Sequence, residues 1–268
     1  MNILLTNDDG IDSEGLRTLA RFLAPWATLW ACAPKEQQSG SGQGITVRES
    51  IWVREEDMEG VVKAWSVAGK PADCVKIALL ELLPEPVDIV ISGINEGANL
   101  GTDTLYSGTV AGAMEGAIHH VPAIAISLAV PLALDGHGKG DWNYESAAGV
   151  CVDLFKRWKS GSLTIHPGNV LNVNVPDIPA EQMKGLKAVN LGIPQYSDHY
   201  DMLGEKNGSR RYNLVGERLA AQELDPRLDT VAVEEGFVTL TPLSVYHTDH
   251  ALLEEITKQL SGKEGFFK

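Results

Sequence analysis

The feature that most constrains the fold is a regular alternation of short apolar runs with segments of helical periodicity. The opening run Asn2 to Thr6 is typical of a buried strand, and Ser13 to Ala24 repeats its apolar residues at the spacing of one helical face. Strand-like runs recur at 27–33, 87–92, 123–128 and 170–175, and helix-like segments at 71–83, 108–119 and 143–158. Strands buried on both faces and separated by helices are typical of parallel sheets. The pattern therefore predicts an α/β fold with a Rossmann-like, mostly parallel sheet flanked by helices.

Two regions interrupt this alternation. Residues 45–68 alternate in a manner suited to antiparallel strands, which predicts a small antiparallel β-extension. Residues 192–230 are polar with little periodicity, and we expect them to form a projecting hairpin or arm. An amphipathic helix at 249–260 belongs to a C-terminal tail of about 243–268. We expect a single α/β domain spanning 1–268, to which the arm and the tail are attached; their use in oligomerisation is implied only by the family resemblance described below.

Composition narrows the possible partners. The chain has 36 acidic and 22 basic residues and a formal net charge of −14, so no nucleic acid polymer is expected to bind through Lys and Arg contacts to phosphates. A small anionic substrate would need local positive charge, such as a metal ion or a helix N-terminus. The cysteines Cys32, Cys74 and Cys151 form no CxxC pair, which indicates reduced, buried thiols. With no signal-like start and no apolar run of membrane-spanning length, we expect a cytoplasmic protein with no membrane partner.

Polar residues follow three of the predicted strands, where ligands bind in open parallel sheets. Asp8 and Asp9 follow the first strand, Ser39 lies in the loop after the second, and Asn95 follows the strand at 87–92. Adjacent carboxylates repel each other unless a cation or a shared proton lies between them. The four side chains together predict one divalent metal ion, Mg²⁺ or Mn²⁺, with Ca²⁺ as a further occupant. The alternatives are an aspartate that caps a helix, a flexible Gly/Ser loop around Ser39, and a turn role for Asn95.

Two further positions are candidates. Ser107, Gly108 and Thr109 open a helix of small residues, where backbone N–H groups and hydroxyls can bind a phosphate. The alternative is an ordinary helix cap with glycines that permit close packing, and both interpretations can hold together. His250 is a candidate general acid if the tail folds back over the site.

Five motifs, in this order and spacing, resemble the SurE family: NDDGIDSEGL, QQSGSGQGIT, KPADCVKIAL, SGINEGANLG and YSGTVAGAMEGA. The resemblance continues through LNVNVP and AVEEGFVTLTPL, and so covers most of the chain. It implies a divalent-metal-dependent 5′/3′-nucleotidase that hydrolyses nucleoside monophosphates, with short-chain polyphosphate as an additional substrate of some members. It also implies metal ligands at Asp8, Asp9, Ser39 and Asn95 and a phosphate-binding turn at 107–109.

The resemblance further implies a homodimer or homotetramer in which C-terminal segments are exchanged between subunits. The chain departs from the family at Tyr246, where members often carry aspartate, whereas His250 matches a histidine in the tail of some members. For catalysis we expect Asp8 or Asp9 to orient or deprotonate a water. Asn95 and the 107–109 turn would hold the phosphate oxygens, and His250 or solvent would protonate the leaving oxygen.

Other functions fit less well. Haloacid-dehalogenase-like phosphatases need a DxD spacing, which the adjacent pair Asp8 and Asp9 does not provide. Receiver-type signalling modules need an aspartate after a central strand and a lysine after a later one, and the loop at 92–101 offers neither. A non-catalytic nucleotide- or phosphate-binding regulatory protein remains the open alternative.

Overall fold

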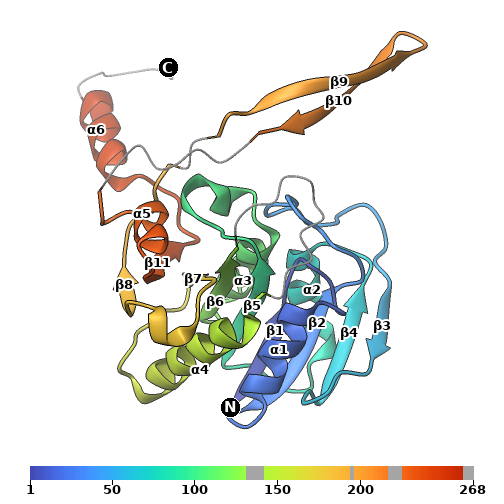
Figure 1. Cartoon of the computed structure of the whole chain (residues 1–268), viewed down its shortest axis with the longest axis vertical. Helices are drawn as coiled ribbons and strands as arrows, with labels where there is room; N and C mark the ends of the chain where they lie inside the picture. The colour runs from blue at the N-terminus through green and yellow to red at the C-terminus, as the bar shows by residue number, and fades with distance from the viewer. Residues whose placement is uncertain (131–141, 194–195, 217–224, 262–268) are drawn as a thin grey trace.

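The computed structural model describes residues 1–130, 142–193, 196–216 and 225–261. A nine-stranded sheet with the order β3-β4-β2-β1-β5-β6-β7-β11-β8 forms the centre of the molecule, and it is parallel from β4 through β7. The outer strand β3 is antiparallel to β4, and β11 is antiparallel to β7. Figure 1 shows helices on both faces of this sheet, which confirms the predicted Rossmann-like α/β fold.

The strands are β1 Asn2–Thr6, β2 Thr28–Pro34, β3 Val53–Glu56, β4 Lys63–Val67, β5 Ile89–Glu96, β6 Ala123–Ala129, β7 Asn169–Pro176, β8 Leu186–Ala188, β9 His199–Lys206, β10 Ser209–Val215 and β11 Val238–Ser244. The α-helices are α1 Glu14–Leu23, α2 Pro71–Ile77, α3 Gly108–Ile118, α4 Tyr144–Ser160, α5 Asp229–Glu234 and α6 His250–Ser261. Three short helical segments are η1 Ala78–Leu82, η2 Gly101–Leu105 and η3 Ala180–Gln182.

The sheet separates two hydrophobic cores. Successive strand residues point to opposite faces, so Leu5 packs in the core under α1 and α4, whereas Leu4 packs in the core under α2 and α3. On the second face α3 lies unusually close to the sheet. A Cβ at its Gly116 would lie 2.7 Å from Val90 Cγ2, so only glycine fits at this contact. The small residues of α3 thus bring the start of this helix close to the end of β1.

Several predicted boundaries differ from the structure. The helix predicted at 71–83 is α-helical only to Ile77 and ends in the π-helical turn η1, because Pro84 disfavours helical conformation at the preceding residue. In the predicted β-extension, only β3 and β4 are strands, and residues 45–52 form none. The three cysteines are free and buried, as predicted.

The predicted arm contains the antiparallel hairpin β9–β10, which projects from the body (Figure 1). Its turn uses Asn207 and Gly208, both with positive φ, as tight hairpin turns require. The elements β8 and α5 were not predicted, because they are too short to show periodicity. Residues 194–195 and 217–224 of the predicted arm, and 262–268 of the predicted tail, lie outside the described residues. Within the described ranges, no helix is both long and apolar enough to cross a lipid bilayer.

Candidate metal and phosphate site

Asn7 shapes the turn that follows β1. Its Oδ1 accepts a hydrogen bond from the Gly10 amide at 3.2 Å, and its Nδ2 donates to the Gly10 carbonyl at 3.0 Å and to Ser13 Oγ at 2.6 Å. Gly10 has φ +105°, a conformation that glycine adopts without strain. Ser13 caps α1 by accepting a backbone N–H of its first turn. Because Asn7 and Ser13 build the turn and the cap, the alternative interpretation of the aspartate pair as helix-capping residues is wrong.

Asp8 is buried where the end of β1 meets the start of α3. The residue is 5% exposed, and the Thr109 hydroxyl donates a hydrogen bond to its Oδ1. A Cβ on Gly108 would lie 2.8 Å from Asp8 Oδ2, so this approach of helix and carboxylate requires glycine. Burial raises the pKa of the Asp8 carboxyl, and hydrogen bonds from Thr109 and from the Gly108 amide oppose that rise. The hydrogen bonds around Asp8 therefore offset only part of the cost of burying its negative charge.

Asp9 is less buried and lies between two other loops. The Glu96 amide donates to its Oδ2 at 3.3 Å, and Gln37 Nε2 donates to its Oδ1 at 3.3 Å. Burial, together with the negative charges of Asp8 and Glu96, raises the pKa of Asp9 to about 7. In the part of the chain that the structure describes, no Lys, Arg or His contributes to the pKa shift of either aspartate.

The donor set fits a divalent cation. Two desolvated carboxylates without a cationic neighbour supply the charged oxygen ligands that Mg²⁺ or Mn²⁺ prefers. The described residues contain no group of three or more His, Cys, Asp or Glu side chains arranged for a metal. A cation bound here would therefore need neutral oxygens as well, which is the role predicted for Ser39 and Asn95.

Asn95 lies near the end of β5, which runs further than predicted. The register between β5 and β6 shifts between Ser92 and Asn95, so the strand continues to Glu96 with an irregularity. Asn95 Nδ2 donates to the Gly97 carbonyl at 2.7 Å, which leaves Oδ1 as the atom for a cation or water. Through the neighbouring Glu96 amide this strand end reaches Asp9, so the structure brings the third predicted loop to the acidic pair.

Two serines of the loop after β2, Ser39 and Ser41, are candidates to supply a side-chain oxygen to the site. The Gln38 amide donates to the Asp8 carbonyl at 2.7 Å, so the loop lies against the acidic pair as predicted. Ser39 is exposed on this loop. Ser41 Oγ, by contrast, is buried without a hydrogen-bond partner and would lie 2.9 Å from a Cβ on Gly108. Coordination of a metal by Ser39 and Asn95 stays a prediction, and Ser41 is a polar group at the site that the sequence did not single out.

The start of α3 is capped by Ser107, as one of its two interpretations predicted, whereas phosphate binding there stays a prediction. Ser107 is the N-cap of the helix and accepts the Val110 amide at 3.0 Å, which leaves its hydroxyl proton available for another acceptor. The Thr109 hydroxyl is already donated to Asp8. The 107–109 turn therefore lies directly beside the acidic pair, with Ser107 as a donor for an anion and the Thr109 side chain as a support for Asp8.

His250 is not close to these residues in the structure. It is an exposed first residue of α6, and Figure 1 shows that helix at the edge of the molecule, apart from β1 and α3. Tyr246 is 65% exposed. A role for His250 as general acid would require a different placement of the tail and stays a prediction.

Sequence reasoning also missed Gln37, Glu96 and Tyr144. The Tyr144 hydroxyl donates to Glu96 Oε2 at 3.3 Å, and burial raises the pKa of the tyrosine. This contact ties the start of α4 to the end of β5, beside Asp9. Gln37 and Glu96 lie within two of the quoted motifs, but nothing in the sequence assigned a role to them or to Tyr144, because these roles depend on contacts between remote segments.

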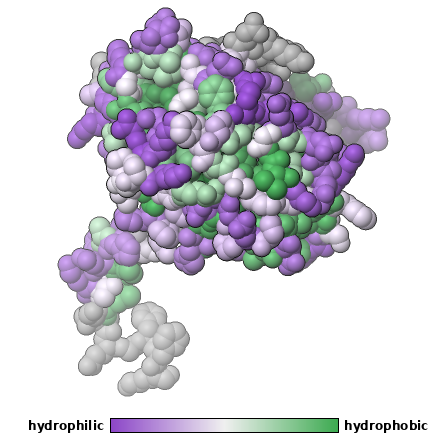
Figure 2. Space-filling model, turned by 90° about the horizontal axis from the view of Figure 1, so that it is seen from below, coloured by the Kyte–Doolittle hydropathy of each residue, from purple (hydrophilic) through white to green (hydrophobic). Residues whose placement is uncertain are grey.

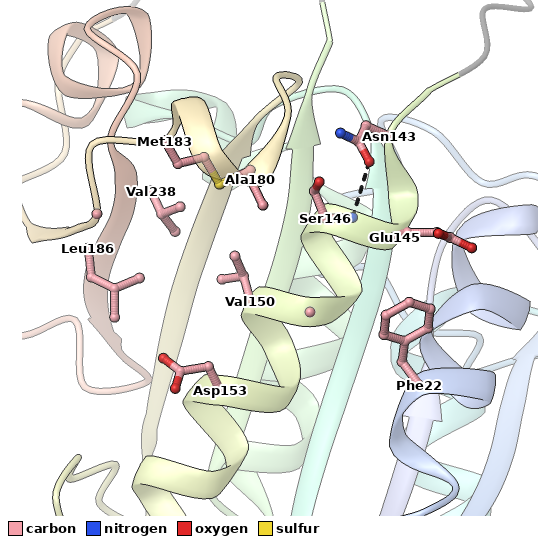
Figure 3. Close-up of a pocket in the computed structure, with 12 residues that line it drawn as sticks. Phe22, Asn143, Glu145, Ser146, Val150, Asp153, Ala180, Met183, Leu186 and Val238 are labelled. Carbon is pink, nitrogen blue, oxygen red and sulfur yellow. Dashed lines mark hydrogen bonds between the residues drawn. The ribbon is translucent and has the colours of Figure 1, made fainter.

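A groove of about 550 Å³ lies elsewhere, between α4 and the β8–β11 edge of the sheet. Figure 3 shows Val150, Leu186 and Val238 facing it, with Glu145 and Asp153 on its rim. Its lining includes none of the predicted site residues, so the groove is separate from the acidic pair.

Comparison with known proteins places the chain in a family. Residues 3–198 match the family model described as "Survival protein SurE". The chain belongs to the SurE family. This confirms the resemblance carried by the five sequence motifs, and the match includes every predicted site residue except His250.

Relatives match almost the whole chain. A protein named 5′-nucleotidase SurE from Heliobacterium modesticaldum is 40% identical over 98% of this chain and 93% of its own length. A protein of the same name from Thermosipho africanus is 37% identical over 98% of this chain and 99% of its own. The crystal structure of the SurE protein from Aquifex aeolicus is 33% identical and aligns with a TM-score of 0.80 over 97% of this chain and 99% of that one.

Proposed function

We propose that this SurE-family chain is a divalent-metal-dependent phosphomonoesterase that hydrolyses nucleoside 5′- and 3′-monophosphates to nucleoside and phosphate. The observation that carries the proposal is the pair of adjacent carboxylates of raised pKa, of which Asp8 lies directly beside the N-terminus of α3 and Asp9 lies against the end of β5. Relatives of similar length that are named 5′-nucleotidase support the nucleotide as the substrate.

Asp8 and Asp9, together with Ser39 and Asn95, would hold the metal ion, which when bound supplies charge neutralisation and a water of lowered pKa. Asp9 is the better placed of the two carboxylates to accept a proton from an attacking water, because it is less buried and hydrogen bonds to Glu96 and Gln37 orient it.

The start of α3 would bind the phosphate. The free N–H groups and the positive end of the helix dipole favour an anion at this position. Ser107 can donate its hydroxyl proton to a phosphate oxygen, and Asn95 can donate the second proton of its Nδ2 to another. Ser41 is a third donor, because its buried hydroxyl has no partner within the described structure. Interactions of this kind accelerate phosphate-ester cleavage where they strengthen as charge develops in the transition state.

The test is phosphate release from a panel of 5′- and 3′-nucleoside monophosphates and short polyphosphate. Chelated protein should be inactive, and added Mn²⁺ or Mg²⁺ should restore turnover. Asp57→Asn, a change of an exposed aspartate far from the site in sequence, serves as the matched control for Asp9→Asn. Turnover that survives chelation would contradict metal dependence. Nucleotide binding without phosphate release under any metal would favour the non-catalytic alternative.

We further propose that the arm and the tail mediate self-association into a dimer or tetramer. On α6, the side chains of Leu252, Leu253, Ile256 and Leu260 are 43–66% exposed, and a single helix does not normally leave such a face in water. Figures 1 and 2 both show this helix standing clear of the body. The hairpin β9–β10 similarly exposes Tyr200, Met202 and Leu214. A second copy of the chain would bury both surfaces.

A further inference from the structure

Asp229 is a fully buried carboxylate that connects two remote segments. It is 0% exposed and begins α5. Its Oδ2 accepts the Gly101 amide at 2.8 Å, while its Oδ1 accepts the Gly192 amide at 2.7 Å and the Thr230 amide at 2.8 Å. Gly101 opens η2, ahead of the phosphate-binding turn, and Gly192 lies at the base of the arm. One side chain thus holds both the segment that leads to the 107–109 turn and the segment at the base of the arm.

The geometry of both partners is closely constrained. A Cβ on Gly192 would lie 2.5 Å from Thr230 Oγ1, so the chain can approach Asp229 here only as glycine. Gly101 has φ +52°, which also favours glycine. A buried charge needs several charge-assisted hydrogen bonds to be tolerated, and these backbone N–H groups supply them. We call Asp229, Gly101 and Gly192 the Asp229 clamp.

A short path of hydrogen bonds leads from the clamp to the 107–109 turn. Within it, the Asp103 amide donates to the Leu100 carbonyl at 3.0 Å, and the Ser107 amide donates to the Asp103 carbonyl at 3.1 Å. The Tyr196 hydroxyl, on the arm side, donates to the Asp103 carboxylate and forms a second connection. Displacement of residues 101–105 would therefore move Ser107, which caps α3.

We propose that Asp229 is a positioning residue for phosphate binding, and that the clamp couples the base of the arm to the 107–109 turn. The inference rests on the proposed function, because it assigns the substrate phosphate to that turn. Asp229 touches none of the site residues and acts through Gly101. Because Asp229 binds both segments, a well-ordered arm base should also keep the 107–109 turn well ordered.

Asp229→Asn tests the clamp selectively. An Asn side chain keeps one acceptor oxygen, which can retain the Gly192 and Thr230 amides, while its NH₂ group then faces the Gly101 N–H and repels it. Tyr196→Phe removes the hydroxyl that forms the second connection and keeps the aromatic ring. Tyr212→Phe, an identical chemical change on the exposed hairpin, is the matched control, because its hydroxyl forms no hydrogen bond with a described residue.

Two measurements decide the proposal: steady-state kinetics with a nucleoside monophosphate and Mn²⁺, and hydrogen–deuterium exchange of peptides covering 99–109. Asp229→Asn should raise KM about tenfold, with a smaller change in kcat, because a hydrogen bond to a charged group is lost and the turn is displaced. Exchange should rise over 99–109 and stay unchanged over β1. Tyr196→Phe should shift both readings in the same direction by less, and Tyr212→Phe should match the wild type.

Unchanged exchange over 99–109 in both variants would overturn the clamp, and raised exchange with an unchanged KM would overturn its positioning role. If Asp229→Asn does not fold, Tyr196→Phe decides by the same two readings. If the wild type releases no phosphate, the proposed function fails on its own. The affinity for inorganic phosphate, measured by calorimetry, then replaces KM in the comparison of variants.

Discussion

The hydroxyl of Thr109 donates a hydrogen bond to Oδ1 of Asp8, and so joins the first turn of α3 to the end of β1 across 101 positions of the sequence. This contact fixes one oxygen of a buried carboxylate and leaves the other, Oδ2, directed toward Gly108 and the loop that carries Ser41. The geometry of the acidic pair therefore depends on the helix whose start we propose as the phosphate-binding turn.

Thr109→Val should lower kcat/KM by about 10–100-fold, since loss of a partner that orients a metal ligand typically costs this much. Valine keeps the shape of threonine but cannot donate to Asp8, so the carboxylate loses a hydrogen bond that favours its charged form. The measurement is phosphate release as a function of Mn²⁺ concentration. Thr109→Ser retains the hydroxyl and serves as the control. A loss in Thr109→Ser with no loss in Thr109→Val would show that the methyl group, and not the hydrogen bond, is what matters.

Asp8→Asn and Asp9→Asn should each reduce turnover by more than about a hundredfold, because a direct ligand should exceed the effect of its outer partners. Each change removes a full negative charge from the cation site while preserving side-chain volume. Circular dichroism should show an intact fold in both variants. Wild-type rates in either one would refute the site.

The fold and the acidic pair were predictable for a common physical reason. Parallel strands buried on both faces appear as apolar runs, and their carboxyl ends share one edge, so Asp8, Asp9 and Asn95 could be brought together from sequence alone. The residues that support them could not be found in this way. The glycines of α3 indicated close packing, but no local pattern shows which remote side chains that packing brings together, as in the contacts of Thr109, Ser41 and Asp229.

Boundaries were least predictable where tertiary contacts override local preference. β5 continues through a register shift to Glu96, which the Gly93 in its sequence did not suggest. The helix α5 was not predicted, because its six residues are too few to show periodicity, and only 229–230 of it fall within the predicted arm.

Ser39→Ala and Ser41→Ala should affect different steps. Ser41→Ala should raise KM for the nucleotide by about tenfold or more, because its buried hydroxyl lies near Gly108 and would lose a charge-assisted hydrogen bond to the bound phosphate. Ser39→Ala should instead raise the Mn²⁺ concentration needed for half-maximal activity. Kinetics with nucleotide and metal varied independently separate the two roles. If Ser41→Ala instead raised the Mn²⁺ requirement and Ser39→Ala raised KM, Ser41 would be the metal ligand and Ser39 the phosphate donor.

The metal-free protein should lose stability as pH rises through about 7. The pKa of Asp9 is raised from 3.8 to about 7, so the folded state binds this proton more tightly than the unfolded state. The resulting stabilisation is complete below the unfolded pKa and is lost as pH rises through the folded pKa. In EDTA, Asp9→Asn should therefore have a Tm a few degrees above that of the wild type at pH 8, and a smaller advantage at pH 5.

This comparison has two internal controls. Asp57→Asn, at an exposed position, should show no such pH dependence. Saturating Mn²⁺ should raise the Tm of the wild type at pH 8 and leave Asp9→Asn almost unchanged, because a ligand stabilises only the state that binds it. The same Tm difference between variant and wild type at both pH values would exclude Asp9 as the titrating group.

Deletion of residues 247–268 should convert the proposed dimer or tetramer to a smaller species. β11 extends to Ser244, so a cut at the earlier expected tail boundary of 243 would damage the sheet, whereas a cut after Tyr246 removes α6 alone with its apolar face. Sedimentation velocity of the full chain and the truncated chain measures the effect. Ile256→Asp should weaken assembly in the same way by placing a charge in the buried face, whereas Lys258→Asp, a larger charge change on the same helix, should not. A truncated chain with an unchanged assembly state would show that α6 contributes nothing to the interface, and the hairpin β9–β10 would then be the surface to test.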